Sequence, residues 1–228
     1  MIELGAEESH HALRVLRMDE GSDIVVIDGC GGTSHALIAE TTGGRVVARV
    51  AERQRCSRPA PEIAVFQGAP KGGKGDEVVE HIAELGTADI AFFSSERAVA
   101  RWDSAKAARL SARWEARANA AAARSRNPHA ARIHGVLSWA GLLQRMGAEP
   151  CAVVLWEHAS VPLRERLPTR AERVALVVGP EGGLSSSEVE QLEDAGGVPA
   201  SLGSVILRTE NAAPAAVAAL LWHFGRMG

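Results

Sequence analysis

The sequence predicts an α/β protein in which a small β-domain precedes a larger domain built on a mostly parallel sheet. Up to about residue 58, short apolar runs alternate with glycine-rich turns, which is typical of a small barrel or meander. After that point, apolar runs alternate with helical stretches, which indicates a parallel sheet covered on both faces. We therefore expect one domain at residues 1–58 and a second at residues 59–228.

Each element of the first domain follows from a local pattern. The predicted strands are Ile24–Ile27, His35–Ala39 and Arg45–Val50, because each is an apolar run next to a turn such as Asp28–Gly32. The stretch Arg58–Glu62 has two prolines in three residues and is expected to be an extended linker.

The second domain is expected to alternate strands and helices. Its predicted strands are Ile63–Phe66, Asp89–Phe93, Cys151–Leu155 and Val174–Val178. Its predicted helices are Asp76–Leu85, Ser104–Arg124, Ser185–Ala195 and Ala212–Phe224. Ligands of such sheets bind beyond the carboxyl ends of the strands, so the segments that follow the strands are the candidate sites.

Composition excludes several classes of protein. Hydrophobic residues make up 46% of the chain, but no apolar run approaches the roughly 20 residues of a membrane helix, so no membrane association is expected. The three cysteines have no paired spacing and the eight histidines show no i, i+4 pair, so neither a disulfide framework nor a metal site is predicted. The expected location is cytoplasmic.

The chain has a net charge of −3, but one of its segments is strongly basic. Nine basic residues and two acidic residues lie between Arg97 and Arg132. On the helix predicted there, four arginines favour one face, which suits an RNA backbone: Arg109, Arg113, Arg117 and Arg124. The alternative is a solvated helix face with no partner.

The strongest candidate site is the glycine-rich segment Val178–Ser185. A buried strand enters it, and a helix opened by Ser185 with Glu188 three residues later leaves it, which is a capping-box pattern. Glycines there allow a ligand to approach the backbone closely. The alternative is a tight turn that binds nothing.

Two further segments follow strands. In Ser201–Pro214, an apolar centre is flanked by Gly203 and by polar residues, as an adenosine pocket requires, and Thr209 or Asn211 is expected to cap the final helix. In Ser94–Arg97, the alternative to a functional role is a simple ion pair of Glu96 with Arg97.

The segment Gly68–Gly75 resembles a phosphate-binding P-loop only superficially. Gly75 stands where such a loop needs Ser or Thr for magnesium, and Pro70 removes a backbone donor, so nucleotide hydrolysis is not expected. Lys71 and Lys74 on this flexible loop suit RNA phosphates.

Seven short motifs, in order along nearly the whole chain, resemble the RsmE-type family of ribosomal RNA methyltransferases. After an opening at His10–Arg17, they are Pro70–Gly72, Glu84–Gly86, Ser95–Arg97, Arg113–Trp114, Gly179–Gly183, Ser201–Gly203 and Ile206–Glu210. The resemblance implies a PUA-like barrel at residues 1–58 that lacks a leading strand, followed by a SPOUT domain with a trefoil knot. It also implies a homodimer that methylates N3 of a uridine in small-subunit (16S) ribosomal RNA.

Carried over by position, the resemblance assigns residues to roles. The S-adenosylmethionine pocket would comprise Leu155, Trp156, Gly179, Pro180, Glu181, Gly182, Gly183, Leu202, Gly203, Ile206, Leu207 and Thr209. Arg97 and Arg208 are candidates to stabilise charge on the uracil carbonyls, and Glu181 or Glu210 to accept the N3 proton. RNA would be contacted by Arg14 and Arg17 of the barrel, together with Lys71, Lys74 and the arginines of the basic helix.

The chain departs from the family pattern in places. Ala120–Arg124 stands where the family carries a run with Glu and Gln, and Asn211 replaces a usual Thr or Ser. The alternative from another class is therefore a non-catalytic RNA-binding or ribosome-assembly factor on the same scaffold.

Overall fold

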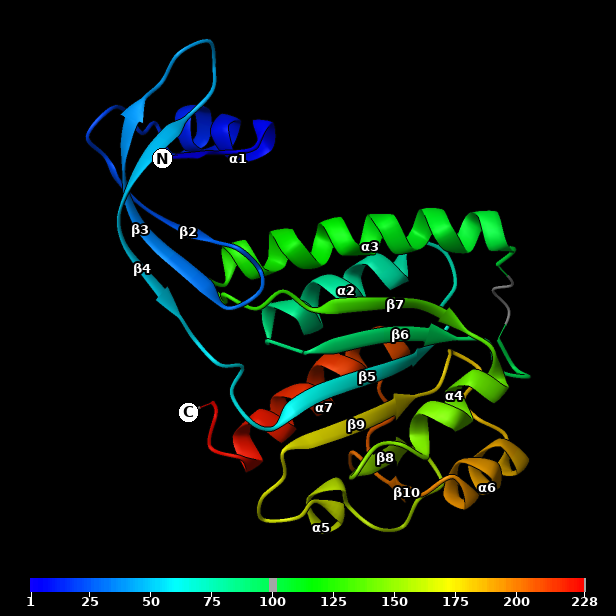
Figure 1. Ribbon diagram of the computed structural model, residues 1–228. Helices are drawn as coiled ribbons and strands as arrows, with labels where there is room; N and C mark the ends of the chain where they lie inside the picture. The colour runs from blue at the N-terminus through cyan, green and yellow to red at the C-terminus, as the bar shows by residue number, and fades with distance from the viewer. Residues whose placement is uncertain (99–101, 228) are drawn as a thin grey trace. The chain divides into compact units, whose positions relative to one another are not determined.

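The computed structural model describes residues 1–98 and 102–227 and divides the chain into two compact units, Met1–Arg58 and Pro59–Gly228 (Figure 1). One of the nine basic residues noted above, Arg101, lies outside the described residues. No helix in the described ranges is both long and apolar enough to cross a membrane.

The N-terminal unit is a curled antiparallel half-barrel. Its strands are β1 (Ile2–Glu3), β2 (Asp23–Ile27), β3 (Gly32–Glu40) and β4 (Val47–Arg55), in the order β1-β4-β3-β2. The chain ahead of His10 supplies β1, in which Ile2 pairs with Ala48. Helix α1 (Ala6–His10) runs into the π-helical turn η1 (His11–Val15), and Ala12, Ile38 and Val46 form a small core.

The C-terminal unit is built on six parallel strands in the order β10-β8-β9-β5-β6-β7 (Figure 1). The strands are β5 (Glu62–Gly68), β6 (Asp89–Phe93), β7 (Arg132–Leu137), β8 (Ala152–Leu155), β9 (Arg173–Val178) and β10 (Gly197–Ala200). The predicted α/β class with a parallel sheet is confirmed. Strands β7 and β10 were not predicted.

Helices cover both faces of this sheet. They are α2 (Lys74–Glu84), α3 (Ser104–Arg124), α4 (Trp139–Met146), α5 (Leu163–Arg166), α6 (Ser186–Asp194) and α7 (Thr209–His223). Alternate residues of β5 face opposite cores: Ile63 and Val65 pack with α2, α3 and α7, whereas Ala64 and Phe66 pack with α4 and α6. In the first core, the ring of Trp114 stacks on Phe92 at 4.0 Å.

Charged residues join the amino ends of the strands. The buried carboxylate of Asp89 accepts two hydrogen bonds of 2.8 Å from Arg132, one of 2.8 Å from Arg173, and contacts His134 Nε2 at 2.6 Å. Burial raises the pKa of Asp89, but the hydrogen bonds from Arg132, His134 and Arg173 outweigh that effect and hold it well below the usual range. This network lies at the sheet edge opposite the carboxyl ends of the strands.

Candidate active site

A cavity of about 880 Å³ lies where β8, β9 and β10 end. These three strands are neighbours in the sheet, so the segments that follow Leu155, Val178 and Ala200 meet at one edge. Of the twelve residues predicted for the S-adenosylmethionine pocket, eleven lie in its wall and Gly182 does not. Three segments far apart in sequence therefore form one site.

Two glycines shape this wall for different reasons. Gly203 has a φ of +126°, which side-chain-bearing residues rarely adopt, although a Cβ there would meet nothing within 4 Å. At Gly68, where β5 ends, a Cβ would lie 2.4 Å from the nitrogen of Pro180, so glycine lets the Gly179–Gly183 turn pack on the strand.

Thr209 links the glycine-rich turn to the start of α7. Its hydroxyl donates to the carbonyl oxygen of Gly179 at 2.7 Å and accepts from Gln67 Nε2 at 2.8 Å. The prediction that Thr209 or Asn211 caps α7 is therefore wrong: the N-cap is Arg208, without a side-chain cap bond, and Thr209 is the first helical residue. Gln67, which the sequence analysis missed, is fully buried at the end of β5.

Lys74 lies between the two candidate proton acceptors. Its Nζ lies 3.1 and 3.2 Å from the two carboxylate oxygens of Glu210 and 3.6 Å from Oε1 of Glu181. Hydrogen bonds from its own backbone N–H and from Lys74 hold the pKa of Glu210 below its usual range, and the bond to Glu210 raises the pKa of Lys74. Glu181 Oε1 also accepts from the backbone N–H of Lys71 at 2.9 Å, and no hydrogen bond to Oε2 is found among the described residues.

The two candidate arginines occupy different places. Arg208 lines the cavity, is exposed, and has no carboxylate within 4.0 Å among the described residues. Arg97 does not line the cavity; its Nη1 donates to the carbonyl oxygen of Gly182 at 3.4 Å, on the outside of the glycine-rich turn.

The segment before Arg97 is fixed to the same turn. The backbone N–H of Glu96 donates to Glu188 at 2.7 Å, and the hydroxyl of Ser185 donates to Glu96 at 3.1 Å. Ser185 and Glu188 also form the predicted capping box of α6, which is confirmed. The expected alternative, an ion pair of Glu96 with Arg97, is not found among the described residues.

Comparison with known proteins places the chain in a family. The model described as the RNA methyltransferase domain matches residues 57–221, and the model described as the RNA methyltransferase PUA domain matches residues 4–51. The chain belongs to the ribosomal RNA small subunit methyltransferase E family. The family that the seven motifs indicate is thereby confirmed.

Several members of the methyltransferase E family span almost the whole chain. The protein of that name from Mycobacterium bovis is 34% identical over 94% of this chain and 83% of its own length. The one from Bacillus subtilis is 33% identical over 95% of this chain and 88% of its own length. The crystal structure of a methyltransferase E from Neisseria gonorrhoeae bound to S-adenosyl methionine is 25% identical, with a TM-score of 0.84 over 97% of this chain and 91% of that one.

The basic helix of this methyltransferase E family member is largely neutralised by its neighbour. The acids of α2 form a matching stripe, with Arg113 Nη2 at 2.9 Å from Asp76, Arg117 Nη1 at 3.0 Å from Glu80, and Arg124 Nη2 at 2.7 Å from Glu80. These pairs partly neutralise Arg113, Arg117 and Arg124, which were predicted to contact RNA and remain partly exposed. Arg109 is exposed and has no ion pair within the described ranges.

The remaining basic residues predicted to contact RNA are distributed differently. Lys71 is exposed on the loop before α2, and Lys74 is engaged by Glu181 and Glu210. Arg14 and Arg17 are exposed at and just after η1 in the N-terminal unit. No group of three or more metal-ligating side chains occurs in the described part of the chain.

Proposed function

We propose that this protein transfers the methyl group of S-adenosylmethionine to N3 of a uridine in small-subunit ribosomal RNA. The observation that carries the proposal is the cavity at the ends of β8, β9 and β10, whose wall contains the residues expected for the methyl donor. The family membership supports the same reaction class.

The cavity wall fits such a donor. Leu155 and Leu202 offer apolar surface for an adenine ring, and the backbone of the Gly179–Gly183 turn offers polar groups. Trp156 also lines the cavity, and its Nε1 is buried without a hydrogen-bond partner among the described residues. An acceptor on a bound ligand would satisfy this donor. When bound, S-adenosylmethionine supplies an electrophilic methyl group.

The chain's own residues would prepare the uracil nitrogen. Loss of the N3 proton leaves negative charge on N3 and the two carbonyl oxygens of the base. We assign the proton to Glu181, because its Oε2 is open whereas both oxygens of Glu210 contact Lys74. The exposed guanidinium of Arg208 would stabilise the charge on a carbonyl oxygen, and Arg97 would support the turn that carries Glu181.

RNA would be contacted by Arg14, Arg17, Lys71 and Arg109, which are exposed and have no ion pair within the described ranges. The proposed working form is a cytoplasmic homodimer. Residues on the exposed side of α7 support it, because Ala215, Ala219 and the 70% exposed Trp222 form an apolar strip.

Two measurements test the proposal. Mass spectrometry of ribosomal RNA from a deletion strain should show one N3-methyluridine missing, and the purified protein should restore it to small subunits from that strain. Calorimetry should show binding of S-adenosylmethionine. RNA binding without any heat from S-adenosylmethionine would contradict catalysis and favour a non-catalytic assembly factor.

A further inference from the structure

Two carboxylates share one ammonium group in the wall of the candidate active site. Lys74 is the first residue of α2, Glu210 lies in the first turn of α7, and Glu181 lies in the turn that follows β9. Lys74 Nζ lies 3.1 Å from Oε1 of Glu210 and 3.6 Å from Oε1 of Glu181. The side chains of Lys74, Glu210 and Glu181 are 35%, 13% and 23% exposed, so water screens their charges only in part.

This arrangement gives Lys74 a different role from that of Lys71, three residues earlier. The side chain of Lys71 is exposed and has no ion pair within the described ranges, which suits a phosphate contact. The ammonium of Lys74 instead contacts two carboxylates, and its hydrogen bond to Glu210 raises the pKa of Lys74, so Lys74 stays charged. A cation that two anions already neutralise is poorly suited to bind an RNA phosphate.

Lys74 is the cation on which the charge balance around Glu181 depends. The charged side chains around Glu181 come from several elements: Lys74 from α2, Arg97 after β6, Glu157 after β8, and Arg208 and Glu210 at the start of α7. Among the described residues, no cation other than Lys74 lies within 4.0 Å of a carboxylate oxygen of Glu181 or Glu210. Carboxylates that share a site without such a cation retain a proton, because the second negative charge is disfavoured. A protonated Glu181 could not accept the N3 proton of uracil.

We propose that Lys74 is a positioning residue for methyl transfer, which keeps Glu181 and Glu210 ionised together so that Oε2 of Glu181 can accept the N3 proton of the uridine. The inference rests on the proposed function, in which Glu181 takes that proton. The proton moves from N3 to Oε2, and the electron pair of the N–H bond stays on N3 and forms the new bond to the methyl carbon. The electron pair of the broken carbon–sulfur bond stays on the sulfur, which becomes an uncharged thioether. Lys74 keeps its own proton throughout.

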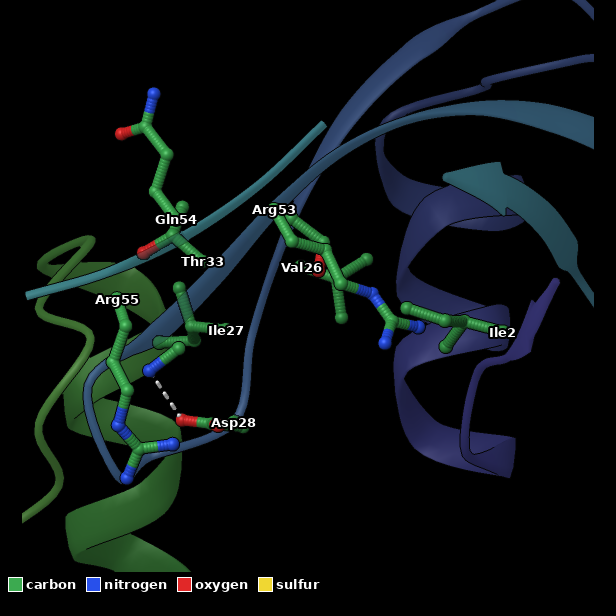
Figure 2. A pocket seen from close by; sticks show the side chains of 10 residues that line it. Ile2, Val26, Ile27, Asp28, Thr33, Arg53, Gln54 and Arg55 are labelled. Carbon is green, nitrogen blue, oxygen red and sulfur yellow. Dashed lines mark hydrogen bonds between the residues drawn. The ribbon is translucent and has the colours of Figure 1, made fainter. Parts of the chain in front are cut away.

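A second cavity, of about 520 Å³ in the N-terminal unit, contains a carboxylate that is held ionised in another way (Figure 2). Asp28 accepts hydrogen bonds of 2.7 Å from the backbone N–H groups of Cys30 and Gly32, and the guanidinium of Arg55 lies beside it (Figure 2). The bonds from Cys30 and then Gly32 hold the pKa of Asp28 below its usual range, and Arg55 adds a smaller effect. Removal of Arg55 is therefore a matched control for removal of Lys74.

The first test measures single-turnover methyl transfer by the full chain to small subunits from the deletion strain, between pH 4.5 and 8. In Lys74→Met, the acid limb of the pH profile should move up by about one pH unit, which is about a tenfold loss of rate on the acid side. Lys74→Arg keeps the positive charge and should keep the midpoint of the wild type. The control Arg55→Met should also keep that midpoint. An unmoved acid limb in Lys74→Met, or an equal movement in the control, would overturn the proposal.

A second-site change distinguishes an effect of charge from an effect of packing. The double variant Lys74→Met, Glu210→Gln loses one carboxylate together with the ammonium, so the repulsion that Lys74 offsets is absent. Its acid limb should therefore return toward that of the wild type. A double variant displaced as far as Lys74→Met would show that Lys74 acts by packing alone, which contradicts the proposal.

A direct measurement of the carboxyl groups separates this inference from the proposed function. Carbon-13 NMR of the glutamate carboxyl groups over a pH series should show one of the signals of Glu181 and Glu210 titrating about one pH unit higher in Lys74→Met than in the wild type. Unchanged titration of both signals would refute the role of Lys74, whatever the methyl-transfer activity. A wild type without methyl transfer contradicts the proposed function, whereas the altered titration would still show that Lys74 keeps both carboxylates ionised.

Discussion

The backbone conformation of Gly203 should determine whether the cavity can bind S-adenosylmethionine. Its φ of +126° disfavours any β-branched residue, so Gly203→Val should displace the loop that carries Leu202 and Ile206. We expect calorimetry to show at least a hundredfold loss of affinity for S-adenosylmethionine, which is about 2.7 kcal/mol. Gly43→Val, at a φ of +64° in the N-terminal unit, is the matched control and should bind normally. Normal binding by Gly203→Val would remove this loop from the donor site.

The two glutamates near Lys74 should differ in their effect on catalysis. We expect Glu181→Gln to lower the rate of methyl transfer about 10²- to 10⁴-fold while leaving donor affinity nearly unchanged, because it removes the proposed proton acceptor. Glu210→Gln should cost less, since both oxygens of Glu210 already contact Lys74. Single-turnover rates and calorimetry measure the two quantities. The reverse order of rates would assign the proton to Glu210.

Sequence patterns identified most residues that line the cavity, but they did not identify which of those residues contact one another. The glycine-rich segment follows the predicted strand Val174–Val178, so the strand-end rule located it, whereas the segment around Gly203 follows β10, which was not predicted, and was identified from its own residue pattern. The bond from Thr209 to Gly179 joins residues 30 apart, and Lys74 meets Glu210 from 136 residues away, so no local pattern contained either. A polar residue that ends a buried strand was the available signal for Gln67.

At the scale of elements, the ion pairs between α2 and α3 determine which arginines of α3 are available to bind RNA. Arg109→Ala should flatten the salt dependence of RNA binding by about one unit, because Arg109 is the unpaired member of the stripe within the described ranges. Arg117→Ala should keep the RNA affinity and salt slope of the wild type. It should instead lower the free energy of unfolding by about 0.5 kcal/mol through its lost pairs with Asp76 and Glu80. Equal effects of the two changes on the slope would contradict this division.

The network at the amino ends of the strands should make stability depend on pH. The pKa of Asp89 is lowered in the folded state, so its stabilisation is fully present above the ordinary Asp value of about 3.9 and is lost as the pH falls below it. Asp89→Asn should lower the free energy of unfolding by about 3 kcal/mol at pH 7, because Arg132 and Arg173 lose a buried partner. Denaturation curves of both proteins should converge as the pH falls from 5 toward 2. A difference independent of pH would contradict the assignment.

Strands β7 and β10 were not predicted because each contains a residue that is unusual within a strand. β10 contains Pro199, and proline argues against a strand in the middle of a sheet. The order of the strands resolves this, because β10 is an edge strand that pairs with β8 alone. β7 contains Gly135 at a φ of +71°, which interrupts the apolar run that would identify a strand. In contrast, strand Asp89–Phe93 and helix Ser104–Arg124 have the predicted bounds, because each has an uninterrupted pattern.

At the scale of the whole molecule, one face of α7 packs in the core of the C-terminal unit, and the opposite face is exposed. Ala213, Val217 and Leu220 are buried in the core, which explains most of the apolar character of the helix without a partner. Trp222 is exposed on the other side. We expect sedimentation to show a dimer at micromolar concentration, and Trp222→Arg to shift it to a monomer with unchanged circular dichroism. A wild-type monomer would contradict the dimer.

The strand order also determines when the protein can fold during synthesis. β5 lies at the centre of the sheet between β6 and β9, and about a hundred residues separate its end at Gly68 from the start of β9 at Arg173. Such non-local pairing has a high contact order and folds slowly. In a nascent chain that has emerged only through β7, the edge of β5 that pairs with β9 still has unpaired backbone N–H and C=O groups. The sheet therefore closes only after β9 has been translated, and incomplete chains carry an unpaired central strand until then.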